Sequence, residues 1–190
     1  MAEIIEVLCQ EHRNIEKLLL VLEQELNVFD HGNRPDYEVM LAVIDYFRKY
    51  PDVCHHPKED IVFEKFTARD PVGAAAIGDL KAEHRAMAAR LRQVADAVER
   101  VLNDQILPRQ AVDDIVREFI DRERQHIATE ERTVFPAVVR ALRPEDWADI
   151  ARKIADRYGP PSQPDFEEQF STLRRNILDL EGEAETTRSN

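Results

Sequence analysis

Two short motifs with metal-binding residues each occur twice along the chain, and this repeat limits the fold more than any other feature. Glu-His-Arg triplets recur 72 residues apart at 11–13 and 83–85, and His-x-x-x-Glu steps recur 71 residues apart at 55–59 and 126–130. The repeat predicts a tandem of two helix pairs, each contributing two histidines and one carboxylate. Six such ligands suit two metal ions.

Composition favours helices throughout. Helix-forming residues dominate the 190-residue chain, glycine occurs five times, and the helix breakers cluster at a few places. No segment shows the alternating pattern of a strand. At 43% apolar and 34% charged residues, the chain is typical of a globular protein with one well-buried domain. We therefore expect an all-α fold.

Apolar residues at three-to-four spacing predict four long helices joined by short connections, which makes neighbouring helices antiparallel. These helices are expected at 2–30, 37–66, 74–103 and 108–142. Pro51 and Pro57 should distort the second helix between Tyr50 and Lys58, and Pro136 should bend the fourth helix without ending it. The predicted architecture is an antiparallel up-down four-helix bundle over residues 1–142.

Residues beyond the bundle predict further short helices. Arg143-Pro-Glu-Asp opens one helix, Gly159-Pro-Pro-Ser-Gln-Pro is a linker, and a last helix follows at about 165–180. We expect residues 143–180 to form a helical extension packed on the bundle, and residues 181–190 to be a disordered tail.

The charge balance excludes several classes of partner. The chain has 26 basic and 38 acidic residues, a formal net charge of −12, which repels nucleic acid and anionic membrane surfaces. We find no signal peptide and no apolar run of membrane-spanning length. The only cysteines, Cys9 and Cys54, suit a reducing compartment. These features predict a cytoplasmic protein.

The spacing of the motif residues suits a metal centre. Residues four apart lie on one face of a helix, so each His-x-x-x-Glu step can converge on one point. In a four-helix bundle, His12 and His55 could serve one ion and His84 and His126 the other, while two glutamates span both ions. The predicted metal ligands are His12, His55, Glu59, His84, His126 and Glu130.

The chemistry of these ligands favours a reactive centre. Imidazole and carboxylate without thiolate suit iron or manganese better than structural zinc, which prefers a closed set of four ligands. We expect two Fe ions bridged by carboxylate and by oxo or hydroxo, with manganese or zinc as substitutes. Open coordination positions would hold dioxygen, peroxide or nitric oxide.

Several neighbours of the predicted ligands leave alternatives open. His56 could ligate through a shifted register, Glu131 could replace the glutamate before it, and Glu16 could add an oxygen ligand. The competing interpretation of all three is that they hydrogen-bond to a ligand from behind or lie on the helix surface. Cys9 and Cys54 lie close to ligand histidines, although packing is the simpler role for each.

The runs at 50–60 (YPDVCHHPKED) and 130–136 (EERTVFP) resemble the second- and fourth-helix signatures of the hemerythrin-like, or HHE cation-binding, family. The similarity covers about residues 5–142 and implies an antiparallel bundle that holds a non-haem di-iron centre on the same six ligands. The oxygen-carrying hemerythrins place a further histidine where this chain has Ala88. Its set of four histidines and two glutamates looks more like the iron-centre repair proteins and the F-box iron sensor.

These features lead to three functional hypotheses. The preferred one is a di-iron protein that binds dioxygen, peroxide or nitric oxide in sensing, storage or stress defence. The second is a di-iron enzyme that decomposes peroxide or reduces nitric oxide. The third is an iron- or oxygen-regulated interaction module that uses the helix after Pro164, whose apolar stripe is more simply explained by packing on the bundle.

Overall fold

The computed structural model describes residues 3–103, 105, 107–158 and 165–188, and these residues contain helices and no strand. Two short π-helical segments, η1 and η2, interrupt the long helices. The elements in chain order are α1 (Glu3–Asp30), α2 (Tyr37–Tyr50), η1 (Pro51–His55), α3 (His56–Arg69), α4 (Pro71–Ile77), α5 (Leu80–Leu102), α6 (Arg109–Thr129), η2 (Glu130–Val134), α7 (Phe135–Ala141), α8 (Pro144–Tyr158) and α9 (Asp165–Arg188).

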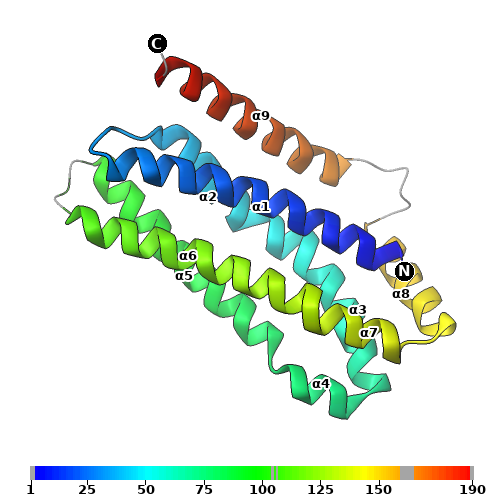
Figure 1. Ribbon diagram of the computed structural model, residues 1–190. Helices are drawn as coiled ribbons and strands as arrows, with labels where there is room; N and C mark the ends of the chain where they lie inside the picture. The colour runs from blue at the N-terminus through cyan, green and yellow to red at the C-terminus, as the bar shows by residue number, and fades with distance from the viewer. Residues whose placement is uncertain (1–2, 104, 106, 159–164, 189–190) are drawn as a thin grey trace.

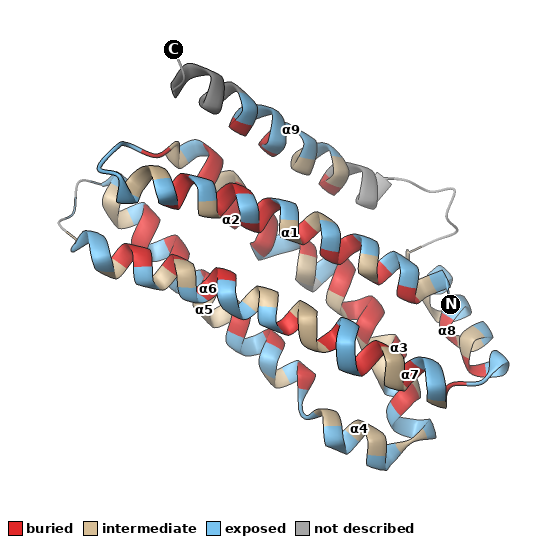
Figure 2. Cartoon of the chain, in the orientation of Figure 1, coloured by how far each residue is buried: buried red, intermediate tan, exposed pale blue. Residues whose placement is uncertain are grey.

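Four helical columns form an antiparallel bundle (Figure 1). The columns are α1, α2–η1–α3, α5 and α6–η2–α7. Contacts run from α1 to α2, from α2 to α5, from α5 to α6, and from α6 back to α1, which closes the bundle. The buried residues lie on the inward faces (Figure 2), as amphipathic helices require. The predicted all-α bundle is confirmed.

The core consists of two apolar clusters separated along the bundle axis. On α1, Leu8 belongs to one cluster and Ile15 to the other, with His12 between them. The same order holds on the fourth column, where Ile120 and Val134 belong to different clusters and His126 lies between them. A layer of ionisable side chains therefore lies between the two apolar clusters.

The prediction of one helix over 74–103 is wrong. The chain forms the short helix α4 from Pro71, breaks at Gly78 and begins α5 at Leu80. Gly78 has φ +95°, a conformation that residues with a side chain rarely adopt. Asp70 and Asp79 accept hydrogen bonds from backbone amides at the starts of α4 and α5 and so stabilise two separate starts.

The C-terminal helix is longer than expected. The sequence predicted an end near Leu180, but α9 continues to Arg188. No proline interrupts this stretch, and Glu181, one turn after the fully buried Ile177, is 5% exposed, so the packed face of the helix extends past residue 180. Residues 159–164, predicted to be a linker, lie outside the described residues.

Helix α9 packs on the outside of the bundle against α2 and α1 (Figure 1). The ring of Phe170 contacts the rings of Tyr46 and Tyr50 edge-on, and Ile177 is fully buried. The described residues of the apolar stripe of α9 therefore pack on the bundle.

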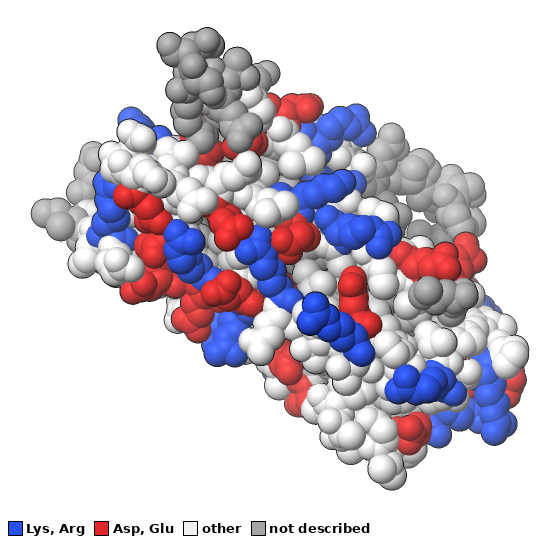
Figure 3. Space-filling model, in the orientation of Figure 1, with Lys and Arg blue, Asp and Glu red and all other residues white. Residues whose placement is uncertain are grey.

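Charged side chains of both signs are interspersed over the face drawn in Figure 3. Arg124 of α6, for example, donates hydrogen bonds to Glu16 and Glu23 of α1 at 2.9 Å each. Within the described residues, no helix combines the length and the apolar character needed to cross a membrane.

Candidate metal centre

The six predicted ligands meet in the interior of the bundle, between the two apolar clusters. Each is at most 8% exposed, and both glutamates are fully buried. All four helical columns contribute. The residues and their elements are His12 (α1), His55 (end of η1), Glu59 (α3), His84 (α5), His126 (α6) and Glu130 (start of η2).

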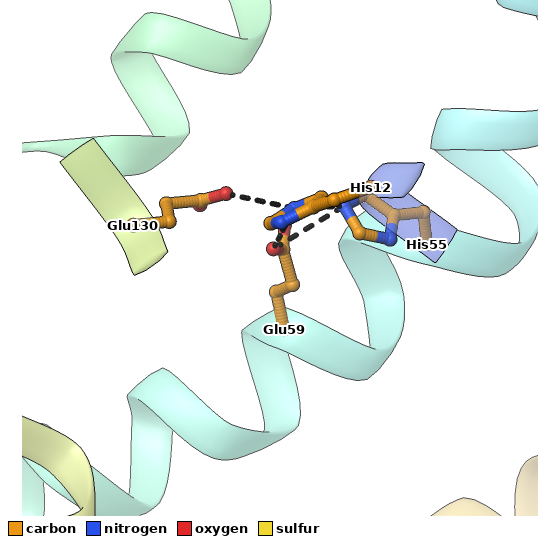
Figure 4. A group of neighbouring side chains, drawn as sticks. All are labelled: His12, His55, Glu59 and Glu130. Carbon is orange, nitrogen blue, oxygen red and sulfur yellow. Dashed lines mark hydrogen bonds and ion pairs between the residues drawn. The ribbon is translucent and has the colours of Figure 1, made fainter. Parts of the chain in front are cut away.

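The first half of the centre contains two histidines and both glutamates. The Nε2 atoms of His12 and His55 are 3.1 Å apart. His55 Nε2 lies 3.3 Å from Glu59 Oε1, and His12 Nε2 lies 3.2 Å from Glu130 Oε2. Figure 4 shows the two carboxylates approaching the imidazoles from different helices. These four residues form a group that could hold a metal ion.

The second half repeats this geometry. The Nε2 atoms of His84 and His126 are also 3.1 Å apart, and His126 Nε2 lies 3.3 Å from Glu130 Oε1. His84, His126 and Glu130 form a second group that could hold a metal ion. Glu59 reaches this half as well, because its Oε2 lies 3.6 Å from His84 Nε2. Each glutamate thus directs one oxygen toward each histidine pair.

The donor set fits two cations. None of the four carboxylate oxygens of Glu59 and Glu130 has a hydrogen-bond partner within the described part of the chain, although all four are buried. These oxygens lie 3.2–3.9 Å from the predicted ligand imidazoles, and buried carboxylates are costly unless they are paired with such groups or coordinate a metal. Two nitrogens bound at about 2.1 Å and at a right angle would lie about 3.0 Å apart, close to the 3.1 Å observed in both pairs.

Outer carboxylates orient three of the ligand imidazoles. Glu11 lies 2.8 Å from His55 Nδ1, Glu83 lies 3.1 Å from His126 Nδ1, and Glu131 lies 3.0 Å from His12 Nδ1. A carboxylate at Nδ1 favours the tautomer that keeps Nε2 free for a metal ion and makes that nitrogen more basic. The imidazoles are thus held with Nε2 toward the centre.

Sequence reasoning missed the role of Glu11 and Glu83. Both residues open the Glu-His-Arg triplets, so the signal was present in the repeat. Their partners, His55 and His126, lie on other helices, and single-helix spacing does not reveal a contact between helices. The repeated unit is therefore larger than three ligands, because each half includes a carboxylate behind one of its histidines.

The two halves differ in the residues that contact Glu11 and Glu83. Glu11 forms an ion pair with Lys58, a lysine that is only 3% exposed. The corresponding position in the second half, 71 residues later, is Thr129, whose hydroxyl donates to the carbonyl of Gln125. Glu83 is 51% exposed. The first half is therefore enclosed by a buried Lys58–Glu11–His55 chain that the second half lacks.

We predict that Lys58→Met lowers the free energy of unfolding by about 3 kcal/mol, because breaking the buried ion pair removes one of the two cationic partners of Glu11 and leaves its Oε1 atom unpaired. Chemical denaturation of the metal-free protein would measure the loss. Arg90→Met is the matched control. Arg90 pairs with the exposed Glu118, and a surface pair of this kind is worth about 1 kcal/mol or less. Equal losses in both variants would contradict a structural role for the buried chain.

The charge state of the metal-free centre is set by imidazoles and carboxylates that are buried close to one another. Burial alone would lower the pKa of His12, but the nearby Glu130 and Glu59 raise it to about 9. Burial would likewise lower the pKa of His55, but Glu59 and Glu11 raise it to about 10. Burial would raise the pKa of Glu59, yet His55 and His12 hold it well below its usual range. Without metal, protons on the imidazoles balance the carboxylates.

Proline-associated π segments flank the ligands. His55 ends η1, and Glu130 begins η2. Pro57 has no amide hydrogen, so it cannot bond the carbonyl of Val53; that carbonyl instead accepts a hydrogen bond from Tyr158 at 3.3 Å. The predicted distortion between Tyr50 and Lys58 is thus a π-helical turn. π turns of this kind often occur at functional sites because they re-aim side chains.

Of the alternative ligands, Glu131 and Glu16 lie outside the groups that could hold a metal ion, whereas His56 forms a third such group with Glu59 and His84. Glu131 contacts His12 Nδ1 from the far side of the ring, and Glu16 pairs with Arg124. His56 stacks on His84, with ring centroids 3.7 Å apart and an interplanar angle of 9°. Cys54 is buried in the apolar core. Burial and the neighbouring Glu131 raise the pKa of Cys9, which favours a neutral thiol.

A four-helix bundle that encloses paired imidazoles and two shared carboxylates defines a cation-binding bundle protein. Comparison with protein families gives the particular group: residues 3–138 match the Hemerythrin HHE cation binding domain, and the chain belongs to this family. The resemblance inferred from the two sequence runs is confirmed. No curated protein and no solved structure matches the chain.

Proposed function

We propose that the protein is a non-haem di-iron protein that binds dioxygen, peroxide or nitric oxide at an open coordination position, in sensing, storage or stress defence. The observation that carries the proposal is the group of four buried carboxylate oxygens without hydrogen-bond partners among the described residues, placed between two histidine pairs. The proposed ligands are His12, His55, Glu59, His84, His126 and Glu130.

The donor chemistry supports iron. Neutral imidazole and carboxylate are borderline-to-hard ligands, and no described group of possible metal ligands includes a cysteine. Each ion would receive two nitrogens and one oxygen from each glutamate, which is fewer than the five or six donors that iron prefers. When bound, a pair of iron ions supplies reversible redox chemistry and free positions for a small ligand.

The protein's own residues would perform three tasks. The four Nε2 atoms hold the ions, and the two shared glutamates balance part of the charge and fix the distance between the ions. Glu11, Glu83 and Glu131 orient the rings from behind. The apolar clusters on both sides limit the contact of the centre with bulk water, which strengthens its electrostatic interactions.

Anaerobic loading with Fe(II), followed by metal counting, tests the metal assignment. We expect two irons per chain. Exposure of the loaded protein to air, nitric oxide or peroxide, with visible spectra recorded, would then show which ligand binds. A stoichiometric spectral change supports binding, whereas many turnovers with peroxide alone, or with nitric oxide and a reductant, would identify an enzyme. If the protein retains no iron above background after treatment with Fe(II), the proposal is refuted.

A further inference from the structure

A cavity of about 380 Å³ reaches the second half of the centre and not the first. Of the six predicted ligands, His84 lines this cavity and the other five do not. Polar and apolar side chains share the lining. The residues that matter here are Phe47, His56, His84, Met87, Ala88 and Glu123.

The first half is closed by its own neighbours. The ring of His12 lies parallel to that of Phe135, with centroids 5.6 Å apart and an interplanar angle of 7°. Behind His55, Glu11 and the buried Lys58 fill the space. His12 and His55 are each 2% exposed, whereas His84 is 8% exposed. An approaching molecule therefore meets side chains at the first half and open space at the second.

Ala88 accounts for this space. It lies one turn after His84 on α5, and Glu123 lies one turn before His126 on the antiparallel helix α6. Because the Nε2 atoms of the two histidines are 3.1 Å apart, Ala88 and Glu123 are displaced to the same side of the centre. A methyl side chain at 88 leaves room there, and the carboxyl group of Glu123 borders it.

His56 forms a possible ligand group with Glu59 and His84, but the stacking of its ring on His84 favours a place in the cavity wall. A metal ion lies close to the plane of the imidazole that binds it, and the two rings are nearly parallel at 3.7 Å. Their planes do not meet near the centre, so one ion cannot bind both rings in the usual geometry. The cavity thus leaves a position, next to a cation that His84 would hold, that no side chain in the described part of the chain fills.

We propose that this cavity is the exogenous-ligand site, so that small ligands bind the cation held by His84 and His126, on the side of Ala88, and not the cation held by His12 and His55. The inference rests on the proposed function. The ligand class is a small molecule that binds a cation end-on through nitrogen or oxygen. The end of the ligand that points away from the cation would face His56 and Glu123, so ligands that can form hydrogen bonds should fit best.

Azide titration of the iron-loaded protein, followed by visible absorption, tests the inference. Ala88→Leu fills the cavity and is expected to weaken azide binding at least tenfold. Ala86→Leu, two residues away on the exposed face of α5, adds the same atoms outside the cavity and should change the affinity less than twofold. Iron content and thermal unfolding of both variants show whether each still folds and holds two ions.

A crystal structure of the wild-type, iron-loaded protein with azide decides the question without any variant. Azide beside His84 supports the inference. Azide beside His12, or an Ala88→Leu protein with two irons and unchanged azide affinity, overturns it and leaves the proposed function intact. Failure of the wild-type chain to hold iron would instead refute the proposed function, and this inference with it.

Discussion

The Glu130→Gln variant is expected to purify with less than one metal ion per chain, compared with the two ions that we propose for the wild-type protein. Glu130 directs Oε2 toward His12 and Oε1 toward His126, so one substitution affects both halves. The glutamine amide has a neutral oxygen and an NH₂ group that cannot bind a cation. Because the two oxygens serve different histidine pairs, the variant should lose both ions and not one.

The same variant should lose the stability that metal binding supplies. A ligand at 100 times its Kd stabilises the native state by about 2.7 kcal/mol, so two sites contribute about 5 kcal/mol. For a chain of this size, that loss lowers Tm by about 10–20 °C. Differential scanning calorimetry with and without Fe(II) would measure the increment, which Glu130→Gln should abolish.

Glu118→Gln serves as the control for this experiment. Glu118 lies on α6, twelve residues before Glu130, and its side chain is 55% exposed and paired with Arg90. The substitution removes a similar charge far from the centre and should leave two ions per chain. Full occupancy in Glu130→Gln, with an unchanged metal-dependent rise in Tm, would exclude Glu130 as a shared ligand.

The second large effect concerns pH. The metal-free protein is expected to lose of the order of 4 kcal/mol of stability between pH 6.5 and pH 9. The folded-state pKa values of His12 and His55, about 9 and about 10, lie above their ordinary value of 6.5. The folded state therefore binds more protons than the unfolded state in this range, and stability falls as pH rises. The contribution is complete below pH 6.5.

His56 makes the stability depend on pH in the opposite direction. Burial, and then the charge of His84, lower the pKa of His56 to about 3. Its neutral ring contributes stability that is complete above pH 6.5 and is lost as pH falls toward 3. These three histidines predict that the metal-free protein is most stable near pH 6.5, and Glu123, whose pKa burial raises to about 7, should broaden this maximum toward lower pH because its neutral form adds stability that is lost as pH rises through 7. Urea denaturation at pH 5, 6.5, 8 and 9 would locate the maximum.

Above pH 6.5 the metal-free protein becomes less stable as pH rises, whereas the affinity for metal should increase. An ion binds neutral imidazole, so loading must displace the protons held by His12 and His55. We expect proton release on loading at pH 8, measured with an indicator dye in weakly buffered solution, and an affinity that increases with pH. A metal-free protein that is equally stable at pH 6.5 and pH 9 would contradict the proton-balanced centre.

The sequence predicted the bundle and the place of the candidate ligands because both depend on local spacing. The i,i+4 step puts His126 and Glu130 on one helix face, and the 71-residue repeat predicts that His55 and Glu59 do the same in the other half. Contacts between helices could not be predicted in this way. Glu11 reaches His55 across 44 positions, and Lys58 is buried because Glu11 is there to pair with it.

Backbone details were also beyond the sequence pattern. Prolines 51 and 57 indicated a distortion, but whether it would be a kink, a break or a π turn depends on how neighbouring helices support the freed carbonyl groups. The carbonyl of Val53 is bonded by Tyr158, a residue 105 positions away. The pattern predicts a continuous helix through Gly78, since an isolated glycine gives no direct sign of its φ angle.

The separation of the apolar interior into two clusters has a consequence for cooperativity. In the metal-free protein the described residues of the two clusters are separated by a layer of imidazoles and carboxylates, so we expect the two ends of the bundle to open in part independently. Bound ions would tie all four columns together at that level. Amide exchange should therefore show two separately opening ends in the metal-free chain and a single opening unit in the loaded one.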